Sequence, residues 1–105
     1  MSNQTADKTI LKELRAITND KANWKTAIDD VAAKLGKQYS EDVKAKALWL
    51  LGEMGLHYPS HIQPYIKQMA DYLRDDNPKL RERSVNALGR IGRADKTLIL
   101  PYFDT

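Results

Sequence analysis

The stretch Leu51-Gly52-Glu53-Met54-Gly55 recurs 37 residues later as Leu88-Gly89-Arg90-Ile91-Gly92. Apolar, basic, proline and tyrosine positions on both sides are related by the same offset: Val43 and Leu80, Lys44 and Arg81, Lys46 and Arg83, Ile62 and Ile99, Pro64 and Pro101, Tyr65 and Tyr102. A match that continues through two expected helices and the loop between them indicates a duplicated structural unit.

A weaker third copy lies upstream. Leu14 lies 37 residues before Leu51, whereas Trp24 lies 38 residues before Ile62, so we expect a shorter loop in the first unit. The paired glycines are missing from this copy. A first unit that departs from the pattern is expected of a capping repeat, because one of its faces meets water.

Each unit is predicted to contain two helices. Apolar residues of the second unit recur at spacings of three and four, which is the pattern of one helix face, at Val43, Ala47, Leu50, Leu51 and Met54 and again at Ile62, Ile66, Met69, Ala70 and Leu73. Strand-like alternation is absent. We therefore expect one domain over residues 1–105, with units at about 7–37, 40–75 and 77–105, the last of them incomplete.

Capping residues predict where these helices begin. Ser40 precedes two acidic residues, and Asn77 precedes Pro78, which suits the first helical position. Ser60 with Gln63 has the spacing of a capping box, and this spacing predicts that Ser60 starts the second helix of its unit, with Pro64 in the first turn.

The two glycines of each repeated stretch are expected to have different roles. Gly55 and Gly92 follow the last apolar residue of a helix, so we expect them in left-handed C-terminal turns. Gly52 and Gly89 lie inside the helical pattern, where glycine costs about 1 kcal/mol relative to alanine. Close approach of a partner helix is the expected compensation at both positions.

These patterns resemble HEAT repeats over nearly the whole chain. The acidic turn and apolar-basic pair of that family correspond to residues 75–81, and its leucine-glycine-x-isoleucine-glycine ending corresponds to residues 88–92. The resemblance implies an all-α fold, a right-handed α-α superhelix (solenoid) of antiparallel helix pairs with about two and a half to three repeats. It also implies that the second helices line the concave side.

The third unit stops at Thr105, soon after its second helix begins. Either the chain is a fragment of a longer array, or another chain covers this end through self-association of the incomplete C-terminal repeat. We favour the fragment interpretation.

Composition excludes several functions. The 105 residues include 17 basic and 14 acidic side chains, which give a net charge of +3, and no cysteine. The lack of cysteine excludes disulfides and thiolate metal sites and favours a reducing compartment. With no secretory signal and no apolar run near 20 residues, we expect a cytoplasmic protein that does not interact with a membrane.

Catalytic and metal-binding constellations are not recognisable. His57 and His61 have an H-x-x-x-H spacing, but Pro59 between them indicates a loop and a helix start. We therefore expect no metal site, no cofactor and no enzymatic activity. Of the two tryptophans, Trp24 aligns with an apolar core position, whereas Trp49 aligns with Asn86 and is expected to pack with partial exposure.

Tyrosines suggest a partner-binding face. The concave face is predicted to carry Tyr65, Gln68, Tyr72 and Tyr102. Tyrosine is enriched at the hot spots of protein interfaces. The alternative is that these tyrosines only border the core. A non-enzymatic protein-protein interaction scaffold is our first functional hypothesis.

Basic residues on the first helices support the alternative hypothesis, binding of a nucleic-acid phosphate backbone, as in HEAT-like DNA repair proteins. Lys44, Lys46, Arg81 and Arg83 are repeat equivalents in two pairs and could form a row across the units. Acidic residues lie between them, which also fits a solvated face or pairing of Lys44 and Arg81 with turn carboxylates.

Overall fold

The computed structural model describes the backbone of residues 2–103 and the side chains from residue 6 onward, and within this range every regular element is a helix. The all-α prediction is therefore confirmed. In chain order the elements are α1 (Ser2–Asn19), η1 (Lys21–Asn23), α2 (Trp24–Ala33), α3 (Glu41–His57), α4 (Pro59–Ile62), η2 (Gln63–Tyr65), α5 (Ile66–Asp71), η3 (Tyr72–Arg74), α6 (Pro78–Ala94), η4 (Lys96–Leu98) and α7 (Leu100–Phe103), where η marks a short 3₁₀ turn.

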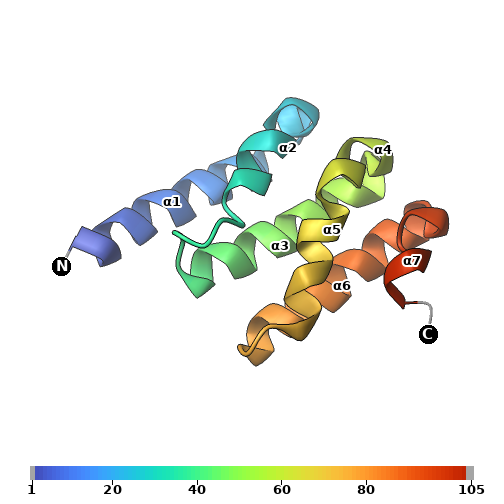
Figure 1. The fold of residues 1–105 in the computed structure, drawn as a ribbon. Coiled ribbons are helices and arrows are strands. Elements are labelled where there is room, and N and C mark those ends of the chain that lie inside the picture. The colour runs from blue at the N-terminus through green and yellow to red at the C-terminus, as the bar shows by residue number, and fades with distance from the viewer. Residues whose placement is uncertain (1, 104–105) are drawn as a thin grey trace.

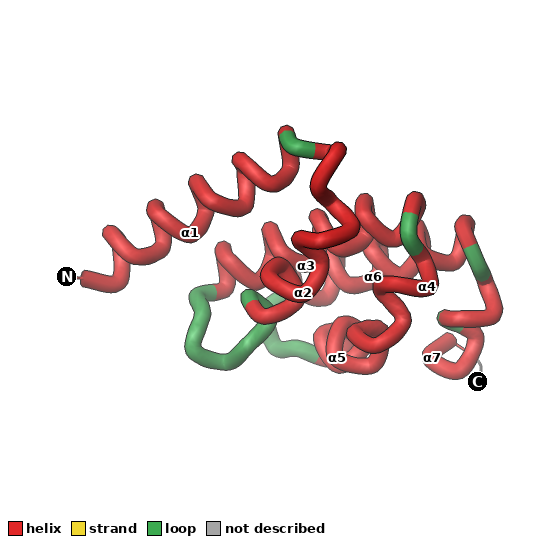
Figure 2. The backbone as a smooth tube through the Cα atoms, turned by 90° about the horizontal axis from the view of Figure 1, so that it is seen from above, coloured by secondary structure: helices red, strands yellow, loops and turns green. Residues whose placement is uncertain are grey.

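The helices form two layers. The long helices α1, α3 and α6 run side by side (Figure 1), and α2, α5 and α7 lie in a second row beside them (Figure 2). The Cα atoms extend over 43 × 34 × 17 Å, and the shortest dimension fits two helix layers. The handedness of the stack, the repeat count and the unit boundaries stay predictions, and Thr105, where the third unit was expected to end, lies outside the described residues.

Helix α3 is the centre of the core. Nine of its residues are buried, and it packs most extensively against α6. The second row covers the inner side of α3 and α6 with Ile62, Ile66 and Met69, all fully or nearly fully buried. Trp24 is buried as predicted, and its indole N–H donates a hydrogen bond to the Ile17 carbonyl at 2.8 Å, which joins α1 to α2.

Two predicted helix starts are confirmed and one is wrong. The Ser40 hydroxyl accepts a hydrogen bond from the Val43 N–H at 3.2 Å, and the Asn77 side chain accepts one from the Lys79 N–H at 2.8 Å. Ser60, by contrast, lies inside α4, which begins at Pro59 after Tyr58. Proline is well suited to the first helical position because its φ is fixed and its N–H is missing, so Pro59 starts the helix before the capping box can act.

Pro64 divides the second helix of this unit instead of lying in its first turn. The helical segment starts five residues earlier, so Pro64 falls in the 3₁₀ turn η2 between α4 and α5. Proline inside a helix removes one hydrogen bond and disfavours helical geometry at the preceding residue. The second row is therefore a chain of short helices and turns, whereas the first row consists of long helices.

The C-terminal turns predicted at Gly55 and Gly92 are wrong. Helices α3 and α6 continue to His57 and Ala94, and no described glycine has a positive φ. A side chain at either position would instead collide with a neighbouring isoleucine: Ile91 at Gly55, and Ile99 at 2.6 Å from a Cβ at Gly92. These glycines provide space for packing between helices.

Close helix approach is confirmed at Gly52 but not at its repeat equivalent. A Cβ built on Gly52 would lie 2.7 Å from the Cα of Ala87 on α6, whereas a Cβ on Gly89 meets nothing within 4 Å. The difference arises because α6 covers the relevant face of α3, and no described helix covers the same face of α6.

This contrast predicts opposite effects of one substitution at two equivalent sites. Gly52→Ala should destabilise the fold by about 1–3 kcal/mol, the usual cost of overpacking. Gly89→Ala should stabilise it by about 0.5–1 kcal/mol, because alanine favours a helix and has free space here. Urea unfolding followed by circular dichroism measures both, and equal effects of the two substitutions would show that α3 and α6 do not approach as described.

No helix among residues 2–103 is long and apolar enough to cross a lipid bilayer.

Candidate binding surfaces

Two predicted partner-binding tyrosines connect neighbouring parts of the second row. The Tyr65 hydroxyl donates a hydrogen bond to the Asp29 carboxylate, and the Tyr72 hydroxyl donates one to the Leu35 carbonyl. Both tyrosines are half-buried. Their hydroxyl groups are therefore used to fix the segment between α4 and η3 against α2 and the loop after it, which holds their rings in place.

Two grooves lie beside α5. The first includes Gln68 and Tyr72, and the second includes Tyr102. Tyr65 lines neither groove, so the four predicted residues do not form one continuous patch. Asp71 borders both grooves, and the sequence analysis did not identify it because a single exposed aspartate gives no motif.

The lining of each groove combines apolar surface with charges of both signs. The first groove is also lined by Leu35, Lys37, Lys44 and Asp75. The second is also lined by Lys67, Ala70, Leu73, Arg74 and Pro101. Such mixed surfaces suit the side chains of a protein segment.

Tyr72 has a raised pKa. Partial burial disfavours the phenolate, and the negative charges of Asp75 and Asp71 raise the pKa of Tyr72 further. Only the neutral phenol can donate the hydrogen bond to Leu35. The stabilisation from this side chain is therefore complete below the ordinary tyrosine pKa of 10.0 and is lost as the pH rises through the higher pKa of the folded state.

Tyr72→Phe should accordingly reduce the free energy of unfolding by about 1 kcal/mol at neutral pH, the net value of one hydrogen bond. The difference between the two proteins should shrink at pH values well above 10.0, where Tyr72 ionises. Chemical unfolding across this pH range measures the difference, and the late-titrating tyrosinate absorbance that is lost in Tyr72→Phe belongs to Tyr72. A difference that does not change with pH would contradict the assigned hydrogen bond.

The four predicted phosphate-binding residues do not form a single row. Lys44 lies over the ring of Tyr72, with its Nζ 5.9 Å from the ring centroid, and borders the first groove. Lys46 and Arg83 line a different groove, together with Trp49. Residues two positions apart on a helix point about 200° apart, which separates Lys44 from Lys46.

Arg81 stabilises a turn. Its Nη1 donates hydrogen bonds to the backbone carbonyls of Asp75 at 2.7 Å and Asp76 at 3.1 Å. Pairing with the turn was anticipated, although the acceptors are carbonyls and not carboxylates. These bonds satisfy carbonyl groups just before α6, so this guanidinium is already engaged.

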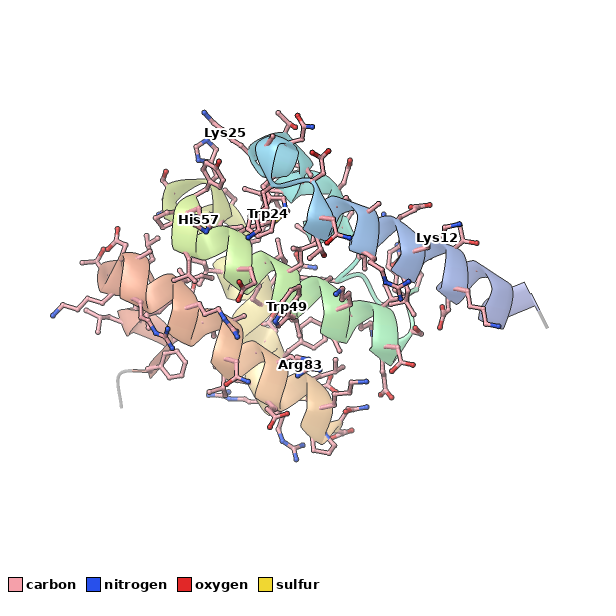
Figure 3. The ribbon with its side chains drawn as sticks, turned by 180° about the vertical axis from the view of Figure 1, so that it is seen from behind. Lys12, Trp24, Lys25, Trp49, His57 and Arg83 are labelled. Carbon is pink, nitrogen blue, oxygen red and sulfur yellow. The ribbon has the colours of Figure 1, made fainter. Side chains whose placement is uncertain are left out.

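The groove of Lys46 and Arg83 lies on the first row of helices, where Trp49 and Arg83 lie close together (Figure 3). The Lys46 ammonium sits over the Trp49 ring, 4.4 Å from its centroid. Burial lowers the pKa of Lys46, and the positive charges of Arg15 and Arg83 lower it further. Arg15 on α1 and Arg83 on α6 are thus both close enough to repel the Lys46 ammonium on α3.

His57 and His61 are not arranged as a pair of ligands. The Tyr58 ring contacts both of them, with centroids 6.4 Å from that of His57 and 6.0 Å from that of His61, and His57 also packs edge-on against Trp24 at 5.9 Å. No cluster of three or more metal-ligating side chains is present among the side chains that the structure describes, those of residues 6–103.

Helices α6 and α7, the last two α-helices of the described chain, expose apolar side chains. Val85, Leu100 and Phe103 are 48%, 52% and 43% exposed, whereas Leu48, the repeat equivalent of Val85, is fully buried. Self-association through the C-terminal repeat stays a prediction.

Comparison with known proteins gives one family match, over about half of the chain. Residues 41–91, which extend from the start of α3 to Ile91 in α6, match the family model described as HEAT-like repeat. No match was found among curated proteins or solved structures.

Proposed function

We propose that this chain, a HEAT-like repeat protein over residues 41–91, is a non-enzymatic scaffold that binds a protein partner in the two grooves beside α5. Repeat proteins present extended surfaces on stacked helices, and side chains from successive units form one binding face. The proposal includes a right-handed arrangement of the helix pairs that makes this face concave, and a cytoplasmic location, which fits a chain without cysteine.

The observation that carries the proposal is the anchoring of Tyr72. Its hydroxyl is bound to the Leu35 carbonyl while its ring remains half-buried at the wall of a groove. A ring already held in its bound position loses little conformational freedom when a partner binds, so more of the contact energy contributes to affinity. Gln68 lies exposed beside it, available to donate or accept hydrogen bonds.

Asp71 gives the proposal a residue that can be tested without disturbing the core. It is exposed and borders both grooves, so a partner that occupies either groove meets its charge. A change of charge at the rim of an interface acts mainly on binding and leaves the fold intact.

A photo-crosslinking side chain placed at position 68 in cells should capture a discrete protein partner. Asp71→Lys in the same protein should reduce the crosslinked product at least tenfold. The matched control places the crosslinker at Glu82, which is exposed on α6 away from both grooves, and should not give that product. Equal capture from positions 68 and 82, or capture at 68 that Asp71→Lys leaves unchanged, would contradict the proposed site.

A further inference from the structure

Two ion pairs connect α3 to α6 on the outer side of the first row. Asp42 binds Lys79 at 2.9 Å, and Glu53 binds Arg90 at 2.7 Å. The members of each pair are 37 residues apart, which is the offset of the sequence repeat. Repeat-equivalent side chains therefore face each other across these two helices.

A third pair at the same offset lies between them and cannot form an ion pair. Lys46 and Arg83 are both positive and line one groove. Arg15 on α1 adds a further positive charge that acts on Lys46. The middle pair thus has like charges where the two outer pairs have opposite ones. Asp42 also lines this groove, but its carboxylate is bound to Lys79.

We propose that the groove formed by Lys46, Trp49 and Arg83, with Arg15 beside it, binds a single phosphate group. Guanidinium groups match phosphate oxygens with two parallel hydrogen bonds, and an ammonium adds a third donor and a point charge. The bound anion, with a charge of about −2 at neutral pH, offsets most of the positive charge of the three cations. This site lies on the first row of helices and is separate from the grooves beside α5.

The spacing of the acidic residues limits the size of the anion. On α3, Asp42 precedes Lys46 by about 6 Å and Glu53 follows it by about 10 Å, at 1.5 Å per residue. The phosphates of a nucleic-acid strand follow one another within several ångströms. If one phosphate occupied the groove, its neighbours would therefore lie against these carboxylates. A single phosphate group in the groove would meet Asp42, whose charge is paired with Lys79, whereas an extended polyanion would also meet Glu53.

Binding of a phosphate would relieve an electrostatic repulsion within the groove. Desolvation and repulsion from two arginines disfavour the charged form of Lys46, which is why its pKa is lowered. Without phosphate, a protein in which Lys46 is replaced by an apolar residue of similar length should therefore have a free energy of unfolding equal to or higher than that of the parent protein. The same replacement should weaken phosphate binding.

Heteronuclear NMR of the indole N–H groups tests the proposal, because the chain contains only two tryptophans. Titration with inorganic phosphate against sodium chloride of equal ionic strength should shift the Trp49 signal, assigned with Trp49→Phe, and leave the Trp24 signal in place. The shift should saturate with one phosphate per chain. Thermal unfolding in the same buffers should show a higher midpoint in phosphate, and this gain should be smaller in Lys46→Met, which keeps the general stabilising effect of phosphate.

Four variants separate the site from general electrostatics. Lys46→Met, Arg83→Gln and Arg15→Gln should each weaken phosphate binding by about tenfold, the scale of one charge-assisted contact. Lys25→Gln removes one positive charge from exposed surface on α2 and should change nothing. Lys46→Met should also be at least as stable as the parent protein in chloride, and a clear loss of stability there would contradict the proposed repulsion.

The source of the phosphate is distinguished by two further titrations. If a phosphoserine peptide binds more tightly than inorganic phosphate, and the same peptide without the phosphate does not bind, the ligand is a phosphorylated protein segment. If the peptide and inorganic phosphate bind with equal affinity, free phosphate is sufficient. A single-stranded oligonucleotide that binds with a steep salt dependence while phosphate does not would overturn the proposal in favour of a polyanion. Absence of a Trp49 shift with all three ligands would also overturn it.

Discussion

The structure depends on one constraint, the close approach of α3 and α6 at Gly52. A Cβ at this position would collide with the Cα of Ala87, so only glycine allows the two helices to pack at this distance. Close packing in turn fixes which residues face each other. Asp42 and Lys79, Glu53 and Arg90, and the like-charged middle pair all follow from this register, and so does the positive groove beside Trp49.

The second row of helices is held by different interactions. Pro64 divides it into short segments that could not be stable alone, since isolated helices of this length are marginal in water. Burial of Ile62, Ile66 and Met69 against the first row stabilises them, and the Ser84 hydroxyl donates a hydrogen bond to the Met69 carbonyl at 2.7 Å. Tyr65 then connects these segments to α2, and Tyr72 connects them to the loop after α2. The grooves beside α5 exist because these segments are short and separately anchored.

The sequence was sufficient for the helix class, the core and two helix starts, because apolar spacing and capping residues act locally. The predictions from sequence were wrong where contacts between distant segments determine which residue is required. Gly55 and Gly92 looked like helix ends, yet the reason for glycine there is an isoleucine on a neighbouring segment. The middle positive pair, Lys46 and Arg83, was visible at the repeat offset, but the contribution of Arg15 depends on how α1 packs. The hydroxyl bonds of Tyr65 and Tyr72 required coordinates.

Native-state hydrogen exchange provides the most direct test of the central claim that α3 and α6 share one core and open together. Backbone amides in the middle of both helices should exchange with the same free energy, equal to that of global unfolding, because neither helix can bury its apolar face without the other. If the free energy of opening for the α6 amides were several kcal/mol lower than that for the α3 amides, the account would be contradicted.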